Sequence, residues 1–226
     1  MAHLCKWSCR LDILLNDVEV RVLGSLIEKD ITTPDYYPLS LNALVNACNQ
    51  KNNRDPVMSL DEDGVRQALH SLQEKRLAGP AAGADSRVTK YEHRLQEAFN
   101  FDRREIALIC VLLLRGPQTL GELRSRAERM HKFGDLDEVQ GTLQHLAQRE
   151  PPLVKIMPRQ PGTKEMRYVH LFSAVLPAWE ATPAPVKLVS ALEEDRLGRL
   201  EQQMSELRDE IAGIKEEFRT FRKQFD

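Results

Sequence analysis

An internal repeat limits the possible folds of this 226-residue chain more than any other feature of its sequence. Asn16–Glu19 and Asp102–Glu105 both have the capping-box pattern, in which a polar cap residue is followed three positions later by glutamate. An apolar stretch follows each box, VRVLGSLIEKD in the first copy and IALICVLLLRG in the second. Both stretches predict a helix, and the numbering of the two copies differs here by an offset of 86.

The match between the copies continues along the chain. Ser40 and Thr119, at an offset of 79, are hydroxyl caps that each open a short helix. Tyr91 and Tyr168, at an offset of 77, each belong to a following hairpin. An apolar helix face also recurs, at an offset of 74, as Val65, Leu69 and Leu72 in the first copy and as Val139, Leu143 and Leu146 in the second. Each change of offset falls between predicted elements, where insertions are tolerated because the backbone there is solvated.

Each copy therefore predicts a helix, a short helix, a longer helix and a β-hairpin, which is the order of a winged helix, a variant of the helix-turn-helix. We expect a mainly α fold with small β-hairpins (α+β), with winged-helix domains over residues 11–97 and 98–175 after an N-terminal extension of residues 1–10. Two generic helical domains with loosely packed hairpins are the alternative.

The C-terminal part predicts a coiled-coil helix over residues 187–226, after a Pro-rich linker at residues 176–186. Its apolar seam alternates spacings of three and four residues through Leu197, Leu200, Met204, Leu207, Ile211, Ile214, Phe218, Phe221 and Phe225. The flanking pairs Arg196–Glu201, Glu210–Lys215 and Glu217–Arg222 are opposite in sign in a parallel pairing. We therefore predict a parallel homodimer, with a trimer or packing of the helix on its own chain as alternatives.

Composition and motifs indicate a soluble, non-enzymatic protein. No apolar run reaches the about 20 residues of a membrane helix, and the N-terminus lacks a secretory pattern, so a cytoplasmic protein is expected. Gly-rich phosphate loops, HExxH and GxSxG are absent from the sequence. Cys5 and Cys9 lack a second ligand pair, so neither a metal nor another cofactor is predicted. Cys48 and Cys110 lie in apolar runs and are expected to be buried.

DNA is the first candidate partner, although the net charge of −2 argues against binding by net charge alone. The wings carry bases at positions that typically lie along phosphates, and the drop in offset from 79 to 74 marks an enlarged, partly basic turn before the third helix of the first copy. The candidate contacts are Lys51 and Arg54 in this turn, Arg66 on the third helix, Arg87, Lys90 and Arg94 in the first wing, and Lys155, Arg159, Lys164 and Arg167 in the second.

The recognition helices weaken this hypothesis, because both open with acids that phosphate repels. We interpret Ser59–Glu62 as a capping box, so the acids at residues 61–63 belong to a helix start. The second hypothesis is a protein–protein interaction scaffold, in which winged helices pack against protein partners without touching DNA.

Three stretches of sequence resemble the bacterial YceH family of uncharacterised proteins. They are NNRDPVMSL after the second helix, PGTKEMRYVHLF in the second wing, and LNDVEVRVLGSLIEKDITTPDYYPLSLNALVNACNQ. The resemblance covers residues 11–173 and implies two tandem winged helices, in agreement with the repeat, but it implies no physiological role.

Overall fold

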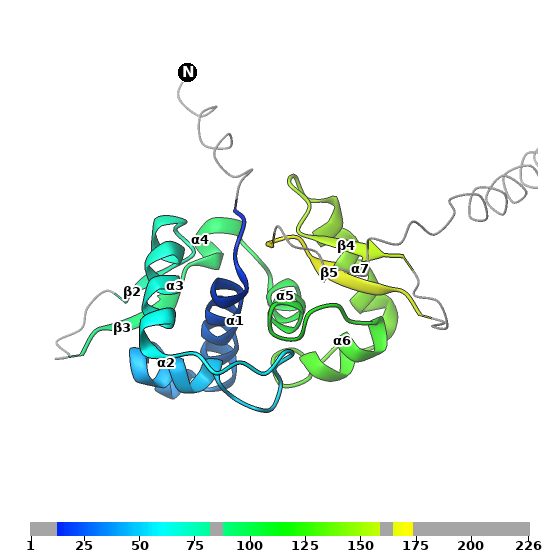
Figure 1. Cartoon of the computed structure of the whole chain (residues 1–226). Coiled ribbons are helices and arrows are strands. Elements are labelled where there is room, and N and C mark those ends of the chain that lie inside the picture. Colours follow the sequence, from blue (N-terminus) through cyan, green and yellow to red (C-terminus); the bar gives the residue numbers. More distant parts are fainter. Residues whose placement is uncertain (1–12, 82–87, 159–164, 174–226) are drawn as a thin grey trace, which may run out of the picture. The chain divides into compact units, whose positions relative to one another are not determined.

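The computed structural model describes residues 13–81, 88–158 and 165–173, which form helices and small antiparallel hairpins (Figure 1). The predicted mainly α, α+β class is confirmed. The first copy contains α1 (Asp17–Thr32), β1 (Leu39–Ser40), α2 (Leu41–Cys48), α3 (Glu62–Glu74), β2 (Ala78–Pro80) and β3 (Lys90–His93). After α4 (Leu95–Phe99), the second copy contains α5 (Arg103–Arg115), α6 (Leu120–Ala127), α7 (Leu136–Gln148), β4 (Val154–Met157) and β5 (Arg167–His170). The predicted coiled-coil seam from Leu197 to Phe225 lies outside the described residues.

The helix starts are set by local capping. The predicted capping boxes form in both copies, with Asn16 capping α1 and Asp102 capping α5. Thr119 and Glu122 form a third capping box at the start of α6. The predicted cap at Ser59 is wrong, because Asp61 caps α3 by accepting a hydrogen bond from the Gly64 amide at 2.8 Å.

The side chain of Asn49 explains this later start of α3. Its amide nitrogen donates to the Leu60 carbonyl at 2.8 Å, and its oxygen accepts from the Leu60 amide at 2.7 Å. Leu60 is thereby held outside the helix, so that the first helical residue can only follow Asp61.

The strand register confirms the repeat. Tyr91 in β3 pairs with Leu39 on one side and with Pro80 on the other, in a sheet of order β1-β3-β2. Tyr168 in β5 pairs with Ile156 and forms an isolated bridge with Gln118, which matches Leu39 at the same offset that relates Thr119 to Ser40. The element order matches that of a winged helix, and the identification of each copy as one stays a prediction.

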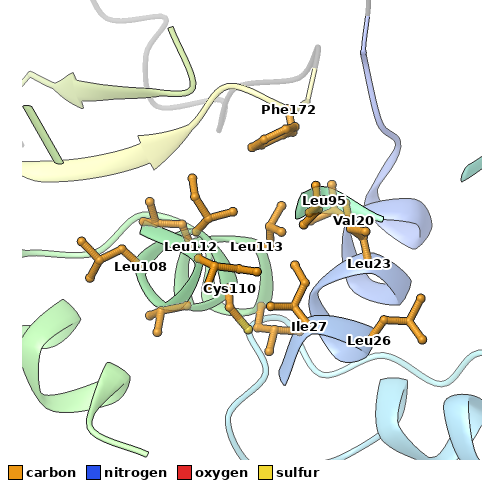
Figure 2. Close-up of a cluster of buried hydrophobic side chains, with 14 of the residues drawn as sticks. Val20, Leu23, Leu26, Ile27, Leu95, Leu108, Cys110, Leu112, Leu113 and Phe172 are labelled. Atoms are coloured by element: carbon orange, nitrogen blue, oxygen red, sulfur yellow. The ribbon is translucent and has the colours of Figure 1, made fainter. Parts of the chain in front are cut away.

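The core is shared by the two copies, because α1 and α5 pack against each other at its centre (Figure 1). All residues from Glu19 to Glu28 and from Glu105 to Leu114 are buried, as in helices covered on every side. Figure 2 shows side chains of both helices meeting, with Phe172 above them. Cys110 lies in this cluster and is buried, as Cys48 also is, and burial raises the pKa of both thiols.

The capping-box glutamates also form a buried ion pair, and they do so in both copies. Glu19 and Glu105 are 2% and 3% exposed, and each pairs with a base that follows the third helix of its own copy. The Glu19 carboxylate lies 2.7 Å from Lys75 Nζ, and the Glu105 carboxylate lies 2.8 Å from Arg149 Nη2. Burial alone raises the pKa of Glu19, but the hydrogen bonds from Lys75 and from neighbouring groups lower it overall. In each copy an ion pair of this kind therefore links the first helix to the residue that follows the third helix.

Candidate nucleic-acid interface

The enlarged turn of the first copy, residues 49–58, is attached to α1. Arg54 is only 5% exposed, and its Nη2 lies 2.6 Å from Glu28 Oε2 and donates to the Ala47 carbonyl at 2.9 Å. This burial corrects the expectation that Arg54 lies at the surface, since a guanidinium enclosed by these partners has no free path to a phosphate. Lys51, the other candidate in the turn, is exposed.

The same turn is also attached to the second copy. The Asp55 amide donates to the Leu114 carbonyl at 2.9 Å, and Arg115 donates to the Asn53 side-chain oxygen. On the opposite side, buried Arg21 of α1 donates to the Pro56 carbonyl at 2.6 Å. The insertion is therefore an internal connector between α1 and α5.

The first copy presents few bases in a position to meet DNA. Lys90 in β3 is exposed, but Arg94 is half-buried and donates to the Pro80 carbonyl at 3.3 Å. Arg66 on α3 is exposed, with Glu62 one turn away at 3.8 Å. Arg87 of the first wing lies outside the described residues.

The second wing is only partly described, because Arg159 and Lys164 lie outside the described residues. Arg167 is held inside its own copy, with Nη1 2.9 Å from the Glu122 carboxylate and 2.9 Å from the Pro117 carbonyl. Burial opposes ionisation of Glu122, but the Thr119 amide and the Arg167 charge keep its pKa below the usual value. Lys155 in β4 is half-buried. The described part of the wing therefore has Lys155 as its remaining candidate.

Two of the three acids at the start of α7 are engaged in capping, and the third, Asp137, is exposed. Asp135 accepts from the Glu138 amide at 2.8 Å, and Glu138 accepts from the Gly134 amide at 2.8 Å. Behind them, Gln140 and Gln144 are exposed on the outer face of α7. The exposed face of α7 behind the capping acids thus carries uncharged amide side chains.

A group of bases that the sequence comparison missed lies beside the start of α7. Arg124 on α6 donates to the Gly134 carbonyl at 2.7 Å, and Lys132 is exposed in the α6–α7 turn. Arg129 is exposed between them in sequence. Matching the two copies could not reveal Arg124 among these bases, because α2, the counterpart of α6, contains no charged residue. Their signal is the local sequence RSRAERMHK itself.

Two cavities border the C-terminal end of α5. One of about 280 Å³ is lined by groups that include Arg21, Asp55 and His170. Burial lowers the pKa of His170 to about 4, so this side chain is neutral at neutral pH. The other, of about 400 Å³, is lined by Arg115, Arg126 and Arg129. No helix in residues 13–81, 88–158 and 165–173 is long and apolar enough to cross a membrane.

Comparison with known proteins gives consistent matches. Residues 15–163 match the model of a family described as proteins of unknown function, DUF480. A UPF0502 protein of Koribacter versatilis is 55% identical over 201 residues, which cover 87% of this chain and 92% of that protein. A UPF0502 protein of Geobacter sulfurreducens is 51% identical over 220 residues, which cover 96% of this chain and 100% of that protein.

Proposed function

Because the chain belongs to the DUF480 family of proteins of unknown function, as its motifs indicated, we propose from its own residues that it is a non-enzymatic DNA-binding protein. In this proposal each copy is a winged helix, and the second copy makes the main contact. Its α7 enters the major groove, since the third helix of this motif is the one that reads DNA.

The observation that carries the proposal is the arrangement around the start of α7. Asp135 and Glu138 are occupied by helix capping, so much of their charge is compensated by backbone amides. Gln140 and Gln144 follow on the exposed face, and their amides can pair with adenine edges. Arg124 contacts the turn before α7 and Lys132 is exposed in that turn, and both can pair with phosphates beside the groove.

The predicted parallel homodimer adds to this proposal. Two chains joined through the seam from Leu197 to Phe225 bring two α7 helices to one DNA molecule. Paired half-sites are the usual target of dimeric helix-turn-helix proteins.

A protein-binding scaffold is the second candidate, and it is favoured by the first copy. Its α2 contains no charged residue, and Glu62 and Asp63 are exposed at the start of α3. Because α2 is uncharged and the start of α3 is acidic, this surface suits a protein partner better than a phosphate backbone.

The test measures binding of the full chain to a labelled DNA duplex by fluorescence anisotropy. We expect affinity to fall steeply between about 50 mM and about 200 mM salt, because counterions are released on binding. Absence of binding at the lower salt concentration would refute the DNA proposal and leave the scaffold role as the better explanation.

A further inference from the structure

We propose that the 400 Å³ cavity at the C-terminal ends of α5 and α6 is a binding site for a phosphate group, built jointly by the two copies. Its walls come from α1, from the enlarged turn, from α5 and from the segment Ser125–Met130. The inference rests on these walls and stands apart from the proposed contact of α7 with DNA.

Three arginines line the cavity, together with two carboxylates, those of Glu28 and Glu128. Arg115 has the neutral side-chain oxygen of Asn53 as its hydrogen-bond partner, and Arg126 has that of Gln118. The carboxylate nearest Arg126, that of Glu122, is 3.4 Å away and is shared with Arg167. Arg129 is exposed and has no ion pair among the described residues. Among the described residues Arg129 thus has no ion-pair partner and Arg115 has a neutral one, so both guanidinium groups can receive an anion.

The enlarged turn increases this positive charge from the other side. Glu28 also lines the cavity, but Arg54 lies 2.6 Å from its carboxylate and neutralises it. The preceding residue, Asn53, holds Arg115 in place. Two neighbouring residues of one insertion thus remove a competing negative charge and fix a guanidinium, which gives the insertion of the first copy a role at the second.

The electrostatics agree with this geometry. Burial lowers the pKa of Arg115, and the nearby charges of Arg126 and Arg54 lower it further, as they do when cations gather without enough counter-charge. A bound phosphate relieves that repulsion. Guanidinium groups bind phosphate through paired N–H donors, and the hydroxyl of Ser125 lines the same space.

The test is calorimetric titration of the full chain with pyrophosphate, with Arg129→Gln and Arg126→Gln as cavity variants. Arg129 is the better choice because it is exposed and unpaired, so its loss leaves the fold intact. We expect each cavity variant to bind pyrophosphate about tenfold more weakly, the value of one charged hydrogen bond. Arg103→Gln, which removes the same charge at the far end of α5, should leave binding unchanged.

The phosphate can belong to the DNA backbone or to a small phosphorylated molecule. If it belongs to DNA, pyrophosphate displaces the labelled duplex and Arg129→Gln weakens both ligands; if it belongs to a small molecule, only pyrophosphate binding changes. Either result supports the site. Absence of pyrophosphate binding by the unmodified chain, or equal binding by Arg129→Gln and Arg103→Gln, overturns it. Neither of these failures affects the duplex titration, so the two proposals are refuted separately.

Discussion

The Cys110 thiol donates a hydrogen bond to the Gly24 carbonyl at 3.5 Å, and these residues occupy the same position in the two copies, at the offset of 86 that relates α1 to α5. A contact between equivalent positions is characteristic of a two-fold interface, in which the same surface is used by both partners. The chain therefore contains, within one polypeptide, the kind of interface that a homodimer forms between two. Close packing at this point depends on the absence of a side chain at Gly24.

Gly24→Ala should destabilise the protein. The new Cβ would lie 2.8 Å from Leu114 Cδ2 and 3.2 Å from Leu113 Cβ, inside a buried helix pair. Overpacking costs about 1–3 kcal/mol, against a gain of about 1 kcal/mol in helix propensity, so we expect a net loss of about 1 kcal/mol in urea unfolding. Gly141→Ala in α7, with no atom within 4 Å, should instead gain up to about 1 kcal/mol. An equal gain at both sites would contradict the proposed close packing.

Arg54→Met should be among the most damaging substitutions in the enlarged turn. It leaves the Glu28 carboxylate buried without its partner at 2.6 Å, which costs about 3–5 kcal/mol of unfolding free energy. Adding Glu28→Gln should recover part of that loss, as measured in a double-mutant cycle. Lys51→Met, at an exposed position of the same turn, is the control. If Arg54→Met and Lys51→Met were equally stable, Arg54 would have to lie at the surface.

His170 should make stability depend on pH. Because burial lowers its folded pKa from 6.5 to about 4, the unfolded chain binds the proton more tightly. Stability is therefore complete above pH about 6.5 and declines as pH falls toward about 4, by up to about 3 kcal/mol. Comparing thermal unfolding of the parent and His170→Gln over this range isolates the contribution of His170, because the remaining titratable groups are the same in both proteins. Parallel curves would show that His170 is not buried as a neutral group.

The two copies should differ in DNA binding. Lys132→Gln, beside α7, should weaken duplex binding and reduce the slope of log affinity against log salt by about one, as expected for one lost phosphate contact. Lys51→Gln, in the corresponding turn of the first copy, should change neither quantity. A larger effect at Lys51 would assign the contact to the first copy.

The heptad seam can be tested in solution. Ile211 occupies an a position, so Ile211→Lys should convert the predicted dimer into a monomer, as measured by light scattering. Gln202→Lys, at an outward f position, adds the same charge and should leave the dimer intact. A monomer already present in the parent protein would remove dimerisation from the proposal.

Features set by neighbouring residues could be predicted from the sequence, and those set by distant partners could not. The caps at Asn16 and Asp102 depend on groups three positions away, and both were predictable. The start of α3 depends on Asn49, which holds Leu60 from a distance of 11 residues. The burial of Arg54 depends on Glu28, 26 residues earlier on another helix, and a basic residue in a polar turn gives no local sign of such a partner.

The complete enclosure of α1 from Glu19 to Glu28 also has a consequence during synthesis of the chain. Part of its cover is α5, and the ribosome adds the equivalent positions only after the rest of the first copy has been made. Because synthesis proceeds at about 5–20 residues per second, the face of α1 around Gly24 stays exposed to water for several seconds before α5 is made. During that interval the nascent chain has an apolar surface that a chaperone, or a neighbouring nascent chain of the same polysome, can occupy in place of α5.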